Sequence, residues 1–363
     1  MHLLINKNRL SKVLNNMSRI ASSRNQLPIL NNILLRADDG KLTLIANNLE
    51  LAIIETLDAK IKKTGVITVP AKPLAEFINN LPNVELNLVA DNTKLKVSSK
   101  GYNATFNGID AEDFPEIPEL ESDALNFTIP VADLRSSLQC VVGATSNDFS
   151  RPALTGVCFS SFGKKLFIAA TDGYRLAEIE LLPKFNDEIR VIVPTPAIQE
   201  ILGTTEEEDI TIKVGSNQIQ FLFPSGTQIT SNLISGSYPD YRQLIPEVGN
   251  DTAAIEREEL LRLLRVAQVF ARVVDNTAVL KTVSKKNLLE VVAVESELGS
   301  NSSEMSAAIS GQDVSMAFNI RFLIDALSVF AAPEAILDFS AGKLIIRGND
   351  TSSLVYIVMP RKA

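Results

Sequence analysis

The chain has 363 residues, with 35 lysines and arginines against 43 aspartates and glutamates and a formal net charge of −8. Because domains average about 150 residues, this length predicts two or three domains, and the 45% apolar and 21% charged residues are typical of globular proteins. One histidine and two cysteines argue against a histidine-based catalytic triad and exclude a zinc tetrad. Without a Walker A or GxGxxG motif, we expect no cofactor.

The sequence also bears on the cellular compartment. No apolar run reaches the ~18 residues that a membrane span needs, and the first residues, MHLLINKNRL, lack the uninterrupted apolar segment of a secretory signal. Cys140 and Cys158 are too few for a disulfide framework. We therefore expect a cytoplasmic protein without membrane contact.

Amphipathic segments recur along the chain. Three such segments start near Leu4, Ile129 and Ile255, and a second set starts at Val69, Val193 and Phe318. Both sets repeat after about 125 residues, which is the length of a whole domain. These patterns predict helices over residues 7–20, 71–81, 131–145, 195–204, 256–272 and 319–331.

Segments of alternating apolar residues, bounded by Gly, Asn, Asp and Ser, lie between the helices and predict β-strands. Corresponding strands are expected in three sets, at 41–48, 165–172 and 288–295, at 94–99, 218–223 and 343–348, and at 102–109, 228–234 and 353–359. We predict an α+β chain of three repeated domains, each with two helices packed on antiparallel β-sheets. The expected domains are 1–124, 125–250 and 251–363, separated by polar linkers.

Positive charge gathers on the first helical segment. Lys7, Arg9, Lys12 and Arg19 lie in it without any acidic residue, while the other five segments are close to neutral. The helices are therefore less acidic than the rest of the chain, and helices facing one way would form a mildly positive surface. The alternative is that these cations lie on the solvated faces of ordinary amphipathic helices.

Seven short motifs, spread in order over the whole chain, resemble one family. They are LPIL (27–30), VPAK (69–72), DFP (113–115), ATDGYRLA (170–177), YPDYR (238–242), FN (318–319) and YIVMP (356–360). Together with the threefold repeat they are similar to the bacterial DNA polymerase III beta subunit, the sliding clamp.

The resemblance implies a head-to-tail homodimeric ring that encircles double-stranded DNA without reading its sequence. It also implies an ATP-driven clamp loader, and binding of the replicative polymerase alpha subunit and other clamp-motif proteins, with no catalysis by this chain. The DNA-binding residues would be Lys7, Arg9, Lys12, Arg19, Lys72, Arg135, Arg262 and Arg265, with Arg24 on a loop that reaches the DNA. Each of them except Arg24 is equally well explained as a solvated surface cation.

The same resemblance implies a pocket for partner peptides beside the C-terminus, at the boundary of the second and third domains. Its residues would be Leu154, Thr171, Gly173, Tyr174, Arg175, Leu176, Pro239, Leu244, Asn319, Phe322, Met359 and Pro360. Apolar side chains would form its walls, Met359 would adapt to different ligands, and Thr171 and Asn319 would offer hydrogen bonds. The alternative is that most of these are ordinary core residues.

Three positions depart from the family pattern. Tyr174 stands where the family often has His, Gln243 where Arg is common, and Arg361 where an apolar residue is typical. The segment 273–281 does not align clearly with the family. We expect these departures to alter the affinity and motif preference of the pocket and to leave its role unchanged.

Two other functions fit parts of the sequence. In an enzyme, Asp172 could act as a catalytic carboxylate beside a phosphate-binding Arg175, or Asp110 could act with Glu112 and Asp113 in acid–base chemistry. Such residues are also common in turns and solvated loops. The second alternative is a three-repeat scaffold that does not encircle DNA.

Overall fold

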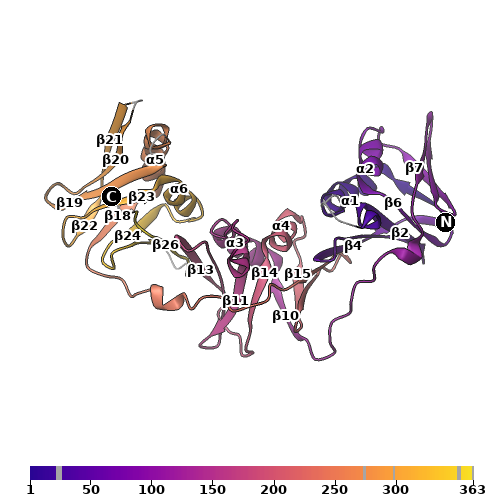
Figure 1. Cartoon of the computed structure of the whole chain (residues 1–363), viewed down its shortest axis with the longest axis horizontal. Coiled ribbons are helices and arrows are strands. Elements are labelled where there is room, and N and C mark those ends of the chain that lie inside the picture. Colours follow the sequence, from indigo (N-terminus) through magenta and orange to yellow (C-terminus); the bar gives the residue numbers. More distant parts are fainter. Residues whose placement is uncertain (22–26, 273–274, 297–298, 350–352, 362–363) are drawn as a thin grey trace. The chain divides into compact units, whose positions relative to one another are not determined.

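The computed structural model describes residues 1–21, 27–272, 275–296, 299–349 and 353–361 (Figure 1). Its residues form two compact units. The first unit contains Met1–Ala132 and Gln199–Leu233, and the second contains Asp133–Ile198 and Ile234–Ala363. In the described part of the chain, no helix is both long and apolar enough to span a membrane.

The described residues contain six α-helices, and each of them matches a predicted helix. They are α1 (Lys7–Ile20), α2 (Ala71–Asn79), α3 (Val131–Val142), α4 (Thr195–Gly203), α5 (Arg257–Ala271) and α6 (Ile320–Ser328). The prediction was wrong only at the ends, because α2, α3 and α6 stop two or three residues earlier than expected and the bounds of α4 and α5 differ by one residue. Pro82 lies just beyond α2 and Gly143 directly follows α3, and these residue types commonly mark a helix C-terminus.

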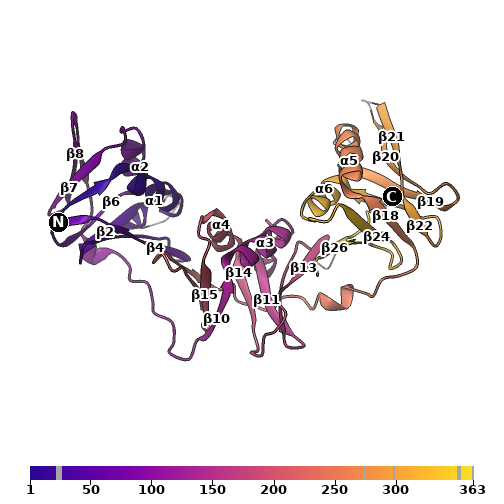
Figure 2. The ribbon, with the colours of Figure 1, turned by 180° about the vertical axis from the view of Figure 1, so that it is seen from behind.

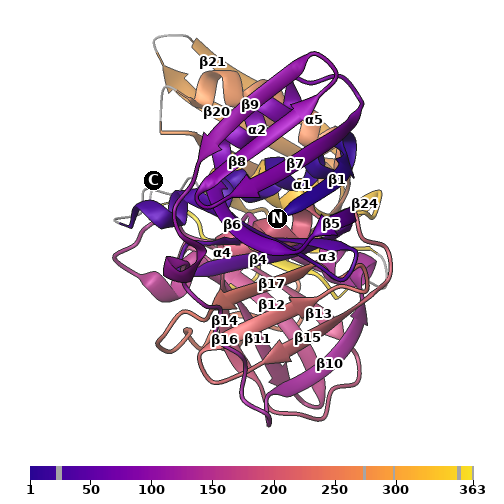
Figure 3. The same ribbon diagram turned by 90° about the vertical axis from the view of Figure 1, so that its right-hand side faces the viewer.

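The first unit holds two antiparallel sheets (Figure 3). The five-stranded sheet has the order β5 (Lys60–Lys63), β1 (His2–Asn6), β7 (Glu85–Asp91), β8 (Lys94–Ser99), β9 (Tyr102–Asn107). The eight-stranded sheet has the order β10 (Leu125–Pro130), β15 (Asp209–Val214), β16 (Gln218–Leu222), β17 (Gln228–Asn232), β4 (Leu51–Asp58), β3 (Lys41–Asn47), β2 (Asn32–Asp38), β6 (Gly65–Pro70).

The second unit also holds two antiparallel sheets. The nine-stranded sheet has the order β14 (Arg190–Pro194), β11 (Gly156–Phe162), β12 (Lys165–Thr171), β13 (Arg175–Leu182), β26 (Val355–Val358), β25 (Leu344–Gly348), β24 (Glu334–Asp338), β18 (Thr252–Glu256), β22 (Ala308–Ser310). The four-stranded sheet has the order β21 (Gly299–Ser306), β20 (Leu288–Ser296), β19 (Thr277–Val283), β23 (Ser315–Asn319).

The sheet orders confirm the threefold repeat. Each repeat contributes two sets of four strands, for example β1-β7-β8-β9 and β6-β2-β3-β4 in the first repeat. The strand sets of neighbouring repeats join edge to edge, at β17–β4 in one large sheet and at β13–β26 in the other. We call these two joins the first seam and the second seam.

Each helix with a described cap begins at the end of a strand. Asn6, Glu256 and Asn319 end β1, β18 and β23, and their side chains accept hydrogen bonds from the first N–H groups of α1, α5 and α6. Such N-caps satisfy donors that the helix leaves unpaired. Leu10, Val13, Leu14 and Met17 recur at helical spacing on α1 and are buried, so the helix packs with α2 in the first unit (Figure 2).

Irregular segments follow the first two repeats. The first connector, residues 111–124, starts with the 3-10 helix η2 (Ala111–Asp113) and leads to β10 (Figure 1). The second connector, residues 237–251, contains the 3-10 helix η4 (Arg242–Leu244) and leads to β18. Each connector lies within one unit, the first connector in the first unit and the second in the second unit.

Candidate functional site

The loop between β12 and β13 is held in shape by its own polar side chains. The Asp172 carboxylate accepts hydrogen bonds from the backbone N–H groups of Tyr174 (2.8 Å) and Arg175 (2.9 Å). The Thr171 hydroxyl accepts from the Gly173 N–H at 3.0 Å and donates to the Arg175 carbonyl. Gly173 has a φ of +91°, in the left-handed region that side chains disfavour. The side chains of Asp172 and Thr171 therefore stabilise the conformation of this loop.

Arg175 fastens this loop to α6. Its Nε donates to Asp172 at 3.0 Å, its Nη1 donates to Asp325 at 2.6 Å, and its Cζ lies 4.4 Å from the ring centre of Phe322. Only 11% of the Arg175 side chain is exposed. These contacts give Asp172 and Arg175 a structural task, which argues against their use as an acid and a phosphate-binding group.

The C-terminal residues run alongside the same loop. The Met359 N–H donates to the Tyr174 carbonyl at 2.8 Å, and the Arg361 N–H donates to the Ala317 carbonyl at 2.8 Å. The Arg361 guanidinium also contacts the Thr277 hydroxyl (3.1 Å) and the Asp275 carboxylate (3.4 Å). Arg361, which departs from the family pattern, thus helps to hold the C-terminal segment in place.

The twelve predicted pocket residues all lie in the second unit, and they differ in exposure. Leu154, in the 3-10 helix η3 (Pro152–Thr155), and Leu176 are core residues that pack in one cluster with Tyr238 and Tyr241. Tyr174, Leu244 and Met359 are 63%, 42% and 40% exposed. The site is therefore a set of exposed apolar side chains on a buried apolar base, which suits a peptide with apolar residues.

The hydrogen bonds expected from Thr171 and Asn319 are already used locally. The Thr171 hydroxyl bonds within the loop, and the side-chain Oδ1 of Asn319 accepts from the Arg321 N–H at 3.0 Å as the cap of α6. Gln243 likewise turns back, because its amide donates to the Asp240 carbonyl at 3.0 Å. These side chains shape the site, and no sequence pattern predicted their local hydrogen-bond partners.

Sequence reasoning also missed residues that hold the second connector beside this site. Arg242 donates to both carboxylate oxygens of Glu178 (2.9 and 3.0 Å) and lies 4.3 and 4.0 Å from the ring centres of Phe162 and Phe167. The motif YPDYR contains Arg242, but Glu178 lies 64 residues away. No local pattern links residues at that separation.

The predicted DNA-binding residues of the first unit lie on α1 and α2. On α1, Arg9 lies 3.8 Å from Asp58 and Arg19 lies 3.5 Å from Glu200, while the Lys12 ammonium donates to the Thr205 hydroxyl at 2.9 Å. Lys7 begins the helix and is half-buried, and Lys72 is exposed on α2. Three of the four cations on α1 therefore have partners within their own unit.

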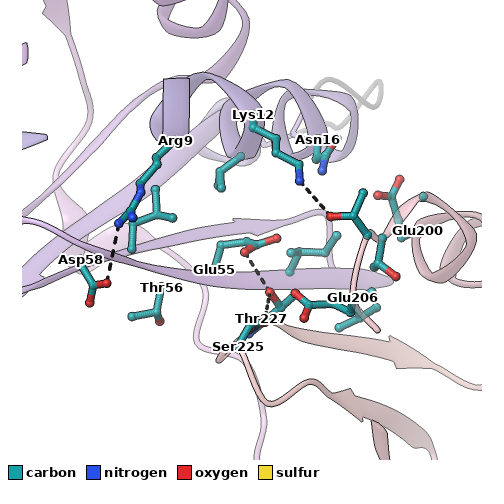
Figure 4. A pocket seen from close by; sticks show the side chains of 17 residues that line it. Arg9, Lys12, Asn16, Glu55, Thr56, Asp58, Glu200, Glu206, Ser225 and Thr227 are labelled. Carbon is teal, nitrogen blue, oxygen red and sulfur yellow. Dashed lines mark hydrogen bonds and ion pairs between the residues drawn. The ribbon is translucent and has the colours of Figure 1, made fainter. Parts of the chain in front are cut away.

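A cavity of about 330 Å³ lies beneath α1 in the first unit (Figure 4). Arg9 and Lys12 reach down to it from the helix, and Glu55 reaches it from β4, where its carboxylate accepts from the Thr227 hydroxyl at 2.9 Å. Burial raises the pKa of Glu55 above its ordinary value, although the Thr227 hydrogen bond and the charge of Lys12 oppose this. The acids of this cavity thus offset part of the positive charge of α1.

In the second unit, Arg135 is half-buried on α3, and Arg262 and Arg265 are exposed on α5. Arg262 lies 4.0 Å from Glu256, which also caps the same helix. Arg24 lies outside the described residues. The predicted cations are therefore confirmed as helix residues, and their contact with DNA stays a prediction.

Three repeats of paired antiparallel sheets with two helices each define a clamp-type fold. Family models match the chain in order: the DNA polymerase III beta subunit N-terminal domain over residues 1–118, its central domain over 128–240 and its C-terminal domain over 242–362. The chain therefore belongs to the DNA polymerase III beta subunit family.

Relatives and solved structures agree with this assignment. The chain is 31% identical to the beta sliding clamp of Synechocystis over 387 residues and 28% identical to that of Pseudomonas aeruginosa over 373, covering 99% and 100% of each protein. Among solved structures, a Pseudomonas aeruginosa sliding clamp superposes with a TM-score of 0.93 at 26% identity. A Bartonella birtlesii clamp bound to griselimycin does so with 0.93 at 25%, both over the full length of each chain.

Proposed function

We propose that this chain works as a DNA sliding clamp in the cytoplasm, where two copies close head to tail into a ring around duplex DNA. The ring tethers the replicative polymerase alpha subunit and other clamp-motif proteins, raising their effective concentration at the DNA, and catalyses no reaction itself. A separate ATP-driven clamp loader would open it. The domains would be 1–124, 125–250 and 251–363.

The observation that supports a ring is a pair of sheet edges that could join two copies of the chain. At both seams the last strand of one repeat pairs antiparallel with the fourth strand of the repeat before it, as β17 pairs with β4 and β26 with β13. The corresponding strands β9 and β21 end their sheets without a further strand among the described residues. Pairing β9 of one copy with β21 of another would repeat the seam, and such a head-to-tail contact can close a ring.

The two seams share one register, which predicts the register between copies. Ile229 lies opposite Ile53 at the first seam, and the corresponding residues at the second seam, Tyr356 and Ala177, are also opposite each other. The pairing of β8 with β9 and of β20 with β21 gives Ala104 and Asn301 these same places. Ala104 should therefore lie opposite Asn301 of the partner subunit.

Apolar side chains flank both edges. Beside β9, Phe77 of α2 packs edge-on against Phe106, with ring centres 5.7 Å apart. Beside β21, α5 exposes Val266 and Val269. Half-buried phenylalanines near one edge and exposed valines near the other support an interface, because pairing would remove more of both from water.

Cross-linking tests this register. In the variant with Ala104→Cys and Asn301→Cys, a short bifunctional thiol reagent should convert most of the protein into covalent dimer. The native thiols give little background, because burial raises the pKa of Cys140 to about 11 and that of Cys158 to about 12. The matched control places the second cysteine at Ser303. Equal cross-linking in both variants, or a monomeric chain, would contradict the proposed seam.

Topological retention tests the function itself. Loaded onto nicked circular DNA by a clamp loader, the protein should survive a high-salt wash and leave when the circle is cut. Salt resistance follows because a ring needs few phosphate contacts, whereas electrostatic binding weakens steeply with salt. Loss in the salt wash, with a control clamp retained, would mean plain electrostatic binding and favour the scaffold alternative.

The partner site is proposed at the twelve residues around the β12–β13 loop. The exposed apolar Tyr174, Leu244 and Met359 over the buried Leu154 and Leu176 support it. Griselimycin, found bound to the Bartonella birtlesii clamp, is a suitable probe. Met359→Ala, or deletion of residues 359–363, should weaken its binding and leave the dimer intact, while Val66→Ala should change neither. Dissociation of the dimer by the deletion would count against the site.

A further inference from the structure

The first connector lies over a large cavity. Within the first unit, a cavity of about 1210 Å³ separates residues 111–124 from the strands of the eight-stranded sheet. Leu34, Ile45 and Ile54 face it from β2, β3 and β4, and Phe114 faces it from the connector. This volume exceeds that of a typical small-molecule pocket, and the cavity runs along an extended segment of chain.

The middle of the connector forms no hydrogen bonds with the rest of the described chain. Phe114 is buried in a small apolar cluster at one end, and Glu121 accepts a hydrogen bond from the Ser216 hydroxyl at 2.5 Å at the other. Within the described part of the chain, no hydrogen bond joins residues 115–120 to other protein groups. Pro115 and Pro118 keep this stretch extended, so its N–H and C=O groups are available to a neighbouring extended chain.

The second connector indicates what such a space accepts. There Tyr238 and Tyr241 are buried against the nine-stranded sheet, and Arg242 lies over two phenylalanines and pairs with Glu178. Counting from the Phe-Pro and Tyr-Pro pairs that start the two connectors, Ile117 and Pro118 stand in the first where Tyr241 and Arg242 stand in the second. At these two positions the first connector therefore has neither the aromatic nor the cationic side chain that fills the corresponding space in the second.

The charges around the cavity are unbalanced. The groups that line it include four glutamates, all on the connector, and two cations on the sheet. The glutamates are Glu112, Glu116, Glu119 and Glu121, and the cations are Arg36 and Lys213. An apolar floor under an acidic connector complements a segment in which basic and apolar residues alternate.

We propose that this groove binds an extended peptide segment of another protein, in which arginine or lysine alternates with apolar residues. The peptide would lie between the connector and the sheet, with its apolar side chains on Ile45 and Ile54 and its cations toward Glu116 and Glu119. This site is separate from the partner site around the β12–β13 loop, and it does not depend on the ring.

Fluorescence anisotropy tests the proposal on the full-length protein. The probes are short labelled peptides in which arginine alternates with leucine, isoleucine or phenylalanine, and the control probes carry glutamate in place of arginine. The wild-type chain should bind at least one arginine peptide and no glutamate peptide. Charge reversal at two exposed connector positions, Glu116→Lys with Glu119→Lys, should weaken that binding about tenfold or more, which is the effect of 1.4 kcal/mol.

The matched control is Glu207→Lys with Glu208→Lys, which changes the net charge equally at exposed positions outside the cavity. It should leave binding within about twofold of the wild type. Hydrogen exchange gives an independent readout, because bound peptide should protect the amides of residues 116–120 and leave the second connector unchanged. Equal weakening in both double variants, no binding of any arginine peptide, or protection elsewhere would each overturn the proposal.

Discussion

The two connectors occupy corresponding places in the repeat, yet they are held differently. The second is fastened along its length: Arg190 donates to the Tyr238 carbonyl (2.8 Å), Arg347 to the Pro246 carbonyl (2.7 Å), and the Gly249 N–H donates to Asp338 (2.9 Å). In the first, Phe114 packs in an apolar cluster and Glu121 accepts a hydrogen bond near the two ends, while residues 115–120 form no hydrogen bonds with the rest of the described chain. A few side chains thus determine whether a connector packs closely on its sheet or leaves an open groove beside it.

This difference bears on the two candidate sites. The second connector carries Pro239 and Leu244, so its fastening holds part of the proposed partner site in place before any peptide arrives, which lowers the entropy lost on binding. The middle of the first connector lacks such hydrogen bonds, so we expect it to lose more conformational freedom on binding. We expect the site beside the second connector to bind more tightly for the same area of contact.

Arg242→Ala should have the largest effect on stability. It removes the partner of Glu178, whose side chain is only 7% exposed, and two contacts with aromatic rings. Leaving that carboxylate buried and unpaired should cost about 3 kcal/mol, measured by urea unfolding followed in the second unit. The corresponding change in the first connector, Pro118→Ala, should cost no more than about 0.5 kcal/mol.

The double variant Arg242→Ala with Glu178→Ala shows how much of the lost stability comes from the interaction between these two side chains and how much from their other contacts. Because it removes the unpaired charge as well, it should be more stable than Arg242→Ala alone. A double variant that is less stable by the sum of both single changes would mean that the ion pair contributes nothing, and that the second connector is held by its tyrosines.

Asp338→Asn should have the next largest effect, and it should depend on pH. Burial opposes ionisation of Asp338, but the N–H groups of Gly249 and Ser340, the Ser340 hydroxyl and the charge of Arg347 outweigh it and lower its pKa below 3.8. An acid with a lowered pKa stabilises the fold above 3.8, and this stabilisation is lost as the pH falls through the lowered pKa.

The substitution should therefore cost about 1–3 kcal/mol at pH 7 and less near pH 3, measured as the shift of the urea midpoint at each pH. Asp240→Asn, at an exposed position on the same connector, is the matched control and should be neutral at both. If the loss of stability were the same at both pH values, it would come from altered packing or hydrogen bonding and not from the charge of Asp338.

The sequence predicted the repeat and its elements well because these rest on local patterns. Helical spacing of apolar residues placed α1 at Lys7–Ile20 without error, and alternation placed β8 and β12 to within a residue. The seams could not be predicted in this way, since β17 pairs with β4 across about 175 residues and no periodicity records that pairing.

The candidate sites were predicted less completely. The resemblance supplied Tyr174, Arg175 and Met359, and the structure brings them together. It did not supply Asp325, which holds Arg175, because an acid on the surface of a helix has many possible partners. The partners of the α1 cations were also missed, because Asp58 and Glu200 lie far from α1 in the chain.

Glu55→Gln should have the smallest effect and the opposite sign. Ile54 and Glu55 are successive residues of β4, so they face opposite sides of the sheet, Ile54 toward the groove and Glu55 toward the cavity beneath α1. Burial raises the pKa of Glu55 above 4.5, so the folded state holds its proton more tightly than the unfolded state. Stability is then fully present below pH 4.5 and falls as the pH rises through the raised pKa.

A neutral glutamine avoids that loss and can still accept the hydrogen bond from Thr227, so Glu55→Gln should stabilise the first unit by at most about 1 kcal/mol at pH 7. The gain should vanish at pH 4, and Glu50→Gln, at an exposed position just before the same strand, should change nothing. Urea unfolding at both pH values measures this. A gain that persists at pH 4 would mean that glutamine packs better than glutamate. The charge of Glu55 would then not destabilise the first unit, in contrast to the ion pair that stabilises the second connector.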